Sequence, residues 1–163
     1  MSSDTLTTLA TLVGAKLSAR GVMLATAESC TGGWVAQSLT AVAGSSAWFE
    51  RGFVTYSDAA KQEMLEVSTE TLAAHGAVSE HTAREMATNA LAHSRAQLAV
   101  AITGIAGPGG GSTEKPVGTV CFAWAKNDGA LNVETRHFAG DRESVRRQSV
   151  MVALQGVLLM LQA

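Results

Sequence analysis

The segment 28–33 places a carboxylate, a hydroxyl and a thiol next to one another and ends in two glycines. Its residues are Glu28, Ser29, Cys30, Thr31, Gly32 and Gly33. An apolar run at 22–27 precedes it and a helix-like run at 34–39 follows, which predicts a strand-to-helix turn. Such a turn can hold a side chain at an exposed bend, and it leaves backbone N–H groups free above a sheet. We therefore expect a nucleophile and an anion-binding turn here, with Ser29 as the first candidate.

Ser29 needs a base, because a serine hydroxyl is a weak nucleophile and most serines before a helix are only caps. Lys61 is the best candidate. Ser57 is predicted to cap a helix that starts at Asp58, which puts Lys61 near its first turn. Burial and the positive end of the helix dipole would both lower the lysine pKa from about 10.4. Taken alone, Lys61 is typical of a solvated lysine, but with Ser29 and Tyr56 it predicts a Ser–Lys pair.

Two alternatives for the nucleophile remain open. Cys30 could react, since a helix N-terminus lowers the pKa of a thiol, or it could be a small buried core residue. A Ser-His-Asp triad has no support, although separation along the chain does not exclude it. The histidines are His75, His81, His93 and His137. None of them lies beside a glycine turn at a strand end, whereas Cys121 lies inside an apolar strand and is predicted to be core.

A glycine-rich loop at 104–111 follows a buried strand and could contact a ligand. It lacks the ending of a Walker P-loop and the order of a Rossmann turn. Its glycines still permit close approach of the backbone to a ligand, and a flexible surface loop is the equal alternative. Thr103 and Gly104 would lie at the end of a central strand, where ligands of open α/β sheets bind.

Three arginines near the start of the last predicted helix form another candidate site. Arg142 and Arg146 are four residues apart and share a helix face, with Arg147 beside them. A guanidinium there could clamp a phosphate or a carboxylate, although a charged face in solvent is the ordinary interpretation. We favour a functional role only for Arg142, because it lies at the helix start next to a glycine.

Helices and strands alternate along most of the chain and must position these residues. Helices are predicted at 6–21, 34–42, from 58, 68–76, from 79 and from 141, and strands at 22–27, 53–56, 97–103, 118–125 and 131–138. Asn-Asp-Gly at 127–129 predicts a hairpin between the last two strands. This order predicts an α/β fold: a three-layer α/β/α sandwich with a mixed, mostly parallel sheet. No linker or repeat divides residues 1–163, so we expect one domain.

Composition narrows the class of protein. The chain has 163 residues and is 47% hydrophobic, which suits one domain with a sizeable core. The net charge of -2 and the lack of a basic block speak against a nucleic-acid partner or an anionic membrane surface. Residues 1–5 lack a secretion-signal pattern, and no apolar stretch has membrane-spanning length. Two cysteines make no disulfide framework, and no Cys/His cluster has zinc spacing. We expect a cytoplasmic protein.

Several short motifs occur together in one order. They are 27–33, Thr55-Tyr56-Ser57 with Lys61, Gly76-Ala77-Val78-Ser79, 103–108 and 115–120. On these motifs the chain resembles, over essentially its whole length, the C-terminal domain family of the competence/damage-inducible protein CinA. Within that family it is similar to the stand-alone nicotinamide-nucleotide amidases. The resemblance implies a three-layer α/β/α fold, with neither a metal nor another cofactor.

The resemblance also implies an activity: hydrolysis of nicotinamide mononucleotide (NMN) to nicotinate mononucleotide and ammonia, in NAD recycling. It implies Ser29 as the nucleophile, Lys61 as the general base and Tyr56 as a further catalytic residue. The implied substrate contacts are Glu28, Cys30, Thr31, Gly32, Gly33, Thr103, Gly104 and Arg142. Backbone N–H groups of 30–33 would stabilise the oxyanion. Whether the loop or Arg142 binds the phosphate stays open, as does whether Glu28 orients Lys61 or the turn.

Partners and one alternative function complete the expectations. The resemblance implies a homo-oligomer, such as a homodimer, with NMN as the small-molecule partner. The apolar C-terminal helix, with Val150, Val157 and Leu161, could cover the core or meet a partner subunit. The alternative function is a non-catalytic nucleotide-binding or regulatory module, which would be stabilised by its ligand without releasing ammonia.

Overall fold

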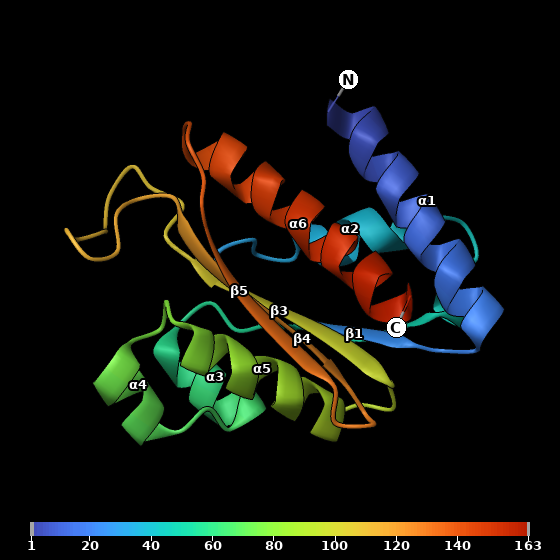
Figure 1. Ribbon diagram of the computed structural model, residues 1–163, viewed down its shortest axis with the longest axis horizontal. Coiled ribbons are helices and arrows are strands. Elements are labelled where there is room, and N and C mark those ends of the chain that lie inside the picture. The colour runs from blue at the N-terminus through green and yellow to red at the C-terminus, as the bar shows by residue number, and fades with distance from the viewer. Residues whose placement is uncertain (1, 163) are drawn as a thin grey trace.

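A five-stranded sheet forms the centre of the computed structural model, which describes residues 2–162 (Figure 1). The strands are β1 (Leu24–Glu28), β2 (Phe49–Val54), β3 (Leu98–Gly104), β4 (Thr119–Lys126) and β5 (Leu131–His137). The helices are α1 (Ser2–Arg20), α2 (Trp34–Thr40), α3 (Asp58–Leu65), α4 (Thr69–His75), α5 (Glu80–Ala92) and α6 (Arg142–Gln162), with a short 3₁₀ turn at Ser45–Ala47. The predicted order of helices and strands is confirmed.

The strands follow the order β2-β1-β3-β4-β5 across the sheet. β1 pairs in parallel with both β2 and β3, while β4 pairs antiparallel with β3 and with β5. Only β4 therefore runs against the other strands, and the mixed, mostly parallel sheet is as predicted. β1 and β3 are neighbours inside the sheet, so their carboxyl ends, residues 28 and 104, lie at the same edge.

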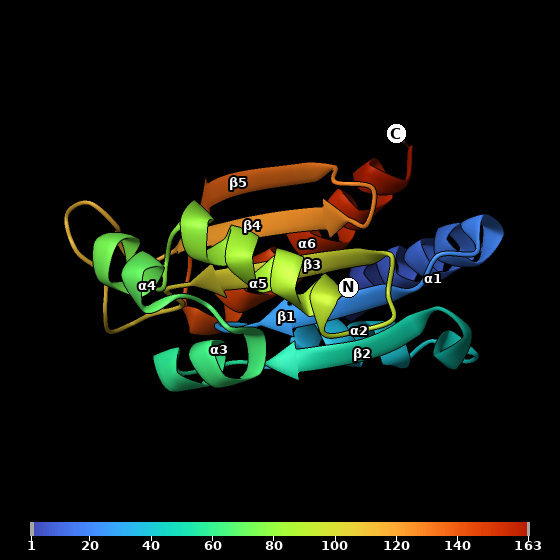
Figure 2. The ribbon, with the colours of Figure 1, turned by 90° about the horizontal axis from the view of Figure 1, so that it is seen from below.

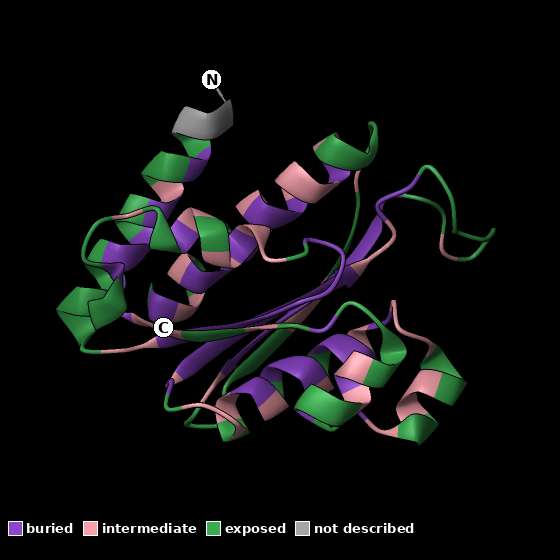
Figure 3. Cartoon of the chain, turned by 180° about the vertical axis from the view of Figure 1, so that it is seen from behind, coloured by how far each residue is buried: buried purple, intermediate pink, exposed green. Residues whose placement is uncertain are grey.

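Helices cover both faces of the sheet and complete the three-layer sandwich. Helices α1, α2 and α6 lie on one side, and α3, α4 and α5 lie on the other (Figures 1 and 2). Successive side chains of β3 point to opposite faces of the sheet, so this strand contributes to the hydrophobic clusters on both faces. Leu98, Val100 and Ile102 belong to the cluster beneath α6, whereas Ala99 and Ala101 belong to the cluster beneath α5. Buried residues accordingly line both sides of the sheet (Figure 3).

The position of β2 differs from the prediction. The sequence indicated a strand at 53–56, but β2 runs from Phe49 to Val54. β2 is an edge strand, paired with β1 within the described residues, and none of its six residues is fully buried, so no apolar alternation marks its first half. Thr55 still extends the contact, because its N–H donates to the carbonyl of Glu28 at 2.8 Å. This bond helps to place the segment that leads into α3.

Gly156 allows α6 to approach the sheet closely. A Cβ added at Gly156 would lie 2.1 Å from the Trp124 ring, whose indole N–H donates to the carbonyl of Ala153 at 3.0 Å. We therefore expect Gly156→Ala to lower the free energy of unfolding by about 1–3 kcal/mol, because the helix or the ring must shift. Thermal unfolding measures this change, with Gln155→Ala on the exposed side of α6 as the control. Equal stability of the two variants would contradict the close approach.

Within residues 2–162, no helix is long and apolar enough to cross a membrane.

Candidate active site

The strand-to-helix turn lies at the carboxyl end of β1. The N–H of Ser29 donates to the carbonyl of Ile102 on β3 at 2.9 Å, and the N–H of Gly32 donates to the carbonyl of Ser29 at 3.0 Å. Gly32 and Gly33 have φ angles of 58° and 103°, a region that favours glycine. The two glycines thus let the chain bend sharply between the strand and α2, and the bend holds Ser29 above the sheet edge.

Ser29 and Lys61 form the predicted pair. The Lys61 Nζ lies 3.0 Å from the Ser29 Oγ and also donates to the carbonyl of Thr55 at 3.0 Å. Helix α3 supplies the lysine, and Ser57 caps it as expected, since its Oγ accepts from the N–H of Ala60. The residue Lys61 is only 1% exposed, although a lysine on a short helix usually reaches solvent. The structure therefore joins two side chains that are 32 positions apart in the sequence.

Burial prepares Lys61 to act as a base. Desolvation lowers the pKa of Lys61 below its ordinary value, and the nearby Asp58 carboxylate opposes this shift only in part. A neutral lysine amine can donate to the Thr55 carbonyl while its lone pair accepts the Ser29 proton. The pair thus has the geometry and the electrostatic environment for nucleophilic catalysis without histidine.

Cys30 lies in a different environment from Ser29. The residue is 5% exposed and belongs to the hydrophobic core beneath α6. Burial raises the pKa of its thiol to about 12, so the thiol stays protonated at neutral pH. A protonated thiol is a poor nucleophile, and of the two alternatives from the sequence the structure favours Cys30 as a core residue.

A cavity of about 260 Å³ opens above the Ser–Lys pair. Its lining residues come from the carboxyl ends of β1 and β3, from α3 and from the loop that follows β3. Figure 2 shows the ends of these two strands and α3 on the same side of the molecule. The predicted site residues that line it are Ser29, Cys30, Tyr56, Lys61, Thr103, Gly104 and Arg142. Asp58 and the segments 77–78 and 105–107 complete most of the wall. The structure therefore gathers Ser29, Lys61 and the glycine-rich loop around one cavity.

Arg142 connects the two sides of the cavity mouth. Its Nη1 donates to the carbonyl of Gly107 at 2.8 Å, and its Nη2 donates to the Tyr56 hydroxyl at 2.9 Å. Tyr56 is 59% exposed, so this hydroxyl lies at the rim and not beneath the reacting pair. The two phosphate-binding candidates from the sequence, Arg142 and the loop 104–111, are thus parts of one rim.

The Glu28 side chain holds the turn and lies outside the wall of the cavity. None of Glu28, Thr31, Gly32 and Gly33 lines the cavity. The Glu28 carboxylate is fully buried and accepts from the Thr31 hydroxyl at 2.6 Å and from the N–H groups of residues 33, 35 and 36 at 3.2, 2.9 and 3.0 Å. It therefore caps the start of α2 and holds the turn, which answers the open question about its role.

Hydrogen bonds within the turn limit which of its backbone N–H groups could stabilise an oxyanion. The N–H groups of Gly32 and Gly33 already donate to the Ser29 carbonyl and to Glu28. Among residues 2–162, neither the N–H of Cys30 nor that of Thr31 donates to a backbone carbonyl outside the helices and strands, and the Cys30 N–H lies against its own thiol sulfur. Of the four predicted donors at 30–33, the N–H groups of Cys30, which lines the cavity, and of Thr31 directly after it therefore stay available to an oxyanion.

Removing the Glu28 carboxylate should destabilise the whole protein. We expect Glu28→Ala to lower the free energy of unfolding by about 3–5 kcal/mol, because the buried Thr31 hydroxyl and three N–H groups, one buried and two partly buried, lose their acceptor. Glu28→Gln should lie between this variant and the wild type, since the amide keeps only one acceptor oxygen. Denaturant unfolding measures both changes, with the exposed Glu63→Gln as the control. Wild-type stability of Glu28→Ala would contradict the capping role.

Arg146 also contacts the turn, although the sequence suggested that it faces solvent. Its Nε donates to the carbonyl of Cys30 at 3.0 Å, and its Nη2 donates to the carbonyl of Thr31 at 3.1 Å. The contact links positions more than 100 residues apart, so no local pattern could identify it. The spacing of four residues from Arg142 was the one available signal, because it puts both arginines on one helix face.

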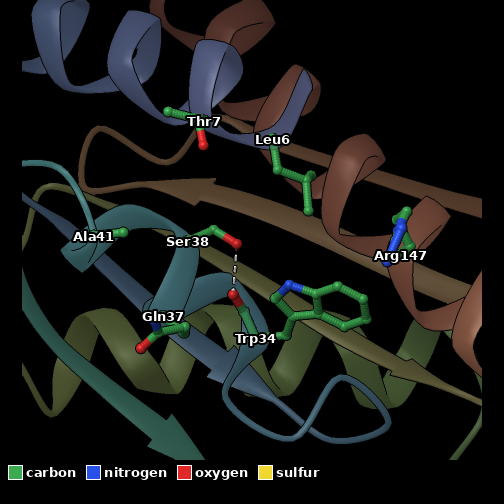
Figure 4. Close-up of a pocket in the computed structure, with 7 residues that line it drawn as sticks. All are labelled: Leu6, Thr7, Trp34, Gln37, Ser38, Ala41 and Arg147. Atoms are coloured by element: carbon green, nitrogen blue, oxygen red, sulfur yellow. Dashed lines mark hydrogen bonds between the residues drawn. The ribbon is translucent and has the colours of Figure 1, made fainter. Parts of the chain in front are cut away.

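A second hollow of about 230 Å³ lies between α1, α2 and α6 (Figure 4). Leu6, Trp34, Ser38 and Arg147 are among its lining residues, and the Ser38 hydroxyl donates to the Trp34 carbonyl at 2.8 Å. Neither Ser29 nor Lys61 lines this hollow. In the part of the chain that the structure describes, no group of three or more His, Cys, Asp or Glu side chains is placed to hold a metal ion.

Comparison with known proteins identifies the family of this chain. The protein-family model described as the CinA C-terminal domain matches residues 6–161 of this chain. The nicotinamide-nucleotide amidohydrolase PncC of Escherichia coli K12 is 58% identical over 155 residues, covering 95% of this chain and 94% of the relative. The protein of the same name from Pseudomonas putida is 50% identical over 155 residues, covering 95% and 96%.

Solved structures give the same answer for the fold. The crystal structure of the competence/damage inducible protein CihA from Agrobacterium tumefaciens superposes with a TM-score of 0.93 at 48% identity, covering 98% of this chain and 96% of that chain. A CinA superfamily protein from Klebsiella pneumoniae 700603 also gives 0.93, at 44% identity and with 96% and 98% covered. The chain belongs to the CinA C-terminal domain family.

Proposed function

We propose that this protein is an amidohydrolase that converts NMN and water to nicotinate mononucleotide and ammonia through a Ser–Lys mechanism. The observation that carries the mechanism is the 3.0 Å contact between the Ser29 Oγ and the buried Lys61 Nζ at the base of a cavity. The substrate is supported by the names of relatives that are 50–58% identical over almost the whole chain.

The first half of the reaction releases ammonia. Neutral Lys61 takes the Ser29 proton as the Oγ attacks the carboxamide carbon, and the N–H groups of Cys30 and Thr31 stabilise the resulting oxyanion. The tetrahedral intermediate then collapses: its C–N bond breaks, and the Lys61 ammonium gives its proton to the departing nitrogen. The products are ammonia and an ester of nicotinate mononucleotide on Ser29.

The second half restores the enzyme. Lys61, neutral again, takes a proton from water as the water oxygen attacks the ester carbonyl. The ester bond to the Ser29 Oγ breaks, and the Lys61 ammonium returns its proton to that oxygen. The rim at Arg142 and Gly107 supports a site for the phosphate, because Arg142 brings a positive charge to the mouth of the same cavity.

The simplest test is release of ammonia by the wild-type protein. NMN and free nicotinamide are compared side by side, and we expect ammonia from NMN and little from nicotinamide, which lacks the ribose phosphate. Thermal unfolding with NMN is measured in parallel. Stabilisation by NMN without ammonia would contradict the enzyme and support the alternative of a nucleotide-binding or regulatory module.

The proposal includes a biological setting. Nicotinate mononucleotide keeps its ribose phosphate, so the reaction conserves the nucleotide for NAD recycling, which we place in the cytoplasm. The homo-oligomer expected from the sequence stays a prediction, and the mass of the protein in solution, measured by light scattering, tests it.

A further inference from the structure

Arg146 differs from the arginine beside it in what it contacts. Its guanidinium donates to the carbonyls of Cys30 and Thr31, the two residues directly after the nucleophile. Among the described residues Arg146 has no carboxylate partner within ion-pair distance. By contrast, Arg147 pairs with Glu143 at 3.1 Å. Both guanidinium groups lie over the Trp34 ring, at 5.6 and 5.4 Å from its centre.

The contact of Arg146 fixes the direction of a peptide group. The carbonyl of Cys30 and the N–H of Thr31 belong to one planar trans peptide, so they point in opposite directions. A guanidinium that holds the carbonyl on the α6 side therefore fixes the N–H on the opposite side. No backbone carbonyl among the described residues accepts from this N–H, which leaves it available to a ligand.

The charge of Arg146 adds to this effect. A charge-assisted hydrogen bond to a carbonyl polarises the peptide and makes its N–H a stronger donor. The second bond, to the Thr31 carbonyl, prevents the guanidinium from rotating away. Gly32 leaves room for the guanidinium, since a Cβ at that position would lie only 3.3 Å from the Arg146 Nη2.

We propose that Arg146 is a positioning residue that aims and polarises the Cys30–Thr31 peptide as part of the oxyanion hole. This inference rests on the proposed amidohydrolase function and extends it. Arg146 does not touch the substrate: it acts on the tetrahedral intermediate through the peptide that it holds. Its loss should therefore lower kcat far more than it changes KM.

The test compares Arg146→Met with Arg147→Met. Arg147 is the matched control, because it faces the indole of Trp34 from the same helix without contacting the turn (Figure 4). We expect Arg146→Met to lower kcat for ammonia release from NMN by about 10²-fold with KM within about threefold, the size of effect that a displaced oxyanion donor gives. Arg147→Met should keep nearly the wild-type kcat.

The thioamide analogue of NMN separates positioning from general damage. Sulfur is a larger and weaker hydrogen-bond acceptor than oxygen, so it gains less from a well-aimed oxyanion hole. We expect the wild type to prefer the amide over the thioamide and Arg146→Met to lose most of this preference. If Arg146→Met does not fold, the same ratio is measured on Arg146→Lys, which keeps the charge but cannot hold both carbonyls in the same way.

Each outcome decides between named alternatives. Equal losses of rate on the amide and the thioamide, or a kcat like that of the wild type, would overturn the positioning role. A wild-type protein that releases no ammonia from NMN would instead overturn the proposed function, and this control is run first.

Discussion

Ser29→Ala should hydrolyse NMN at least about 10³-fold more slowly than the wild type, because the reaction loses the atom that forms the acyl-enzyme. The fold should remain, since the backbone bonds of Ser29 to Ile102 and Gly32 do not involve its side chain. Release of ammonia under saturating NMN measures the rate, and circular dichroism checks the fold. Full activity of this variant would rule out the mechanism.

Cys30→Ala is the matched control for the neighbouring nucleophile. Its thiol is buried, and burial holds its pKa near 12, while the backbone N–H that we place in the oxyanion hole is kept by alanine. We expect this variant to retain the greater part of the activity and to lose some thermal stability. A dead Cys30→Ala beside an active Ser29→Ala would instead indicate a cysteine amidase.

Lys61→Met should also lower the rate by about 10³-fold or more, because Lys61 is the one group among the described residues that is hydrogen-bonded to the Ser29 hydroxyl and can take its proton. Methionine matches the length and apolar character of the lysine stem, so the cavity wall is preserved. A variant with more than a tenth of the wild-type rate would contradict Lys61 as the base. The rate is measured as ammonia release at several pH values.

The same substitution should raise stability, which separates it from a damaged fold. The folded-state pKa of Lys61 lies below its ordinary value of 10.5, so the unfolded chain binds more protons in the window between the two values. The wild type therefore loses stability as the pH falls through this window, and below it the full penalty remains. Methionine has no group that binds a proton, so Lys61→Met does not lose this stability. We expect its unfolding temperature to exceed that of the wild type by a few degrees at neutral pH, with the gain vanishing above pH 10.5.

The fold could be predicted well because its signals are local. The caps Ser57, Ser68 and Ser79 lie where the sequence indicated, each accepting from the N–H three residues later. The hairpin between β4 and β5 follows the turn at 127–129. The start of β2 was missed, because an edge strand with exposed side chains carries no apolar alternation.

The site could be predicted only in part, because several of its contacts join residues that are far apart in the sequence and meet only in the folded protein. Glycine turns and a capped lysine helix identified Ser29 and Lys61, and the fold brings them within 3.0 Å. Glu28 is adjacent to the nucleophile, which made a chemical role attractive, but the direction of its side chain depends on α2. Arg146 reaches the turn from the far end of the chain, and only the packing of α6 against the turn and α2 reveals this contact.

Trapping of the acyl-enzyme by hydroxylamine tests the central claim most directly. An ester on Ser29 partitions between water and hydroxylamine, so the wild type and Cys30→Ala should convert NMN to nicotinohydroxamate mononucleotide in proportion to the hydroxylamine added, with ammonia released for every NMN consumed. Ser29→Ala should form none. If the wild type yields only nicotinate mononucleotide at every hydroxylamine concentration, water attacks the amide directly and the Ser–Lys account is contradicted.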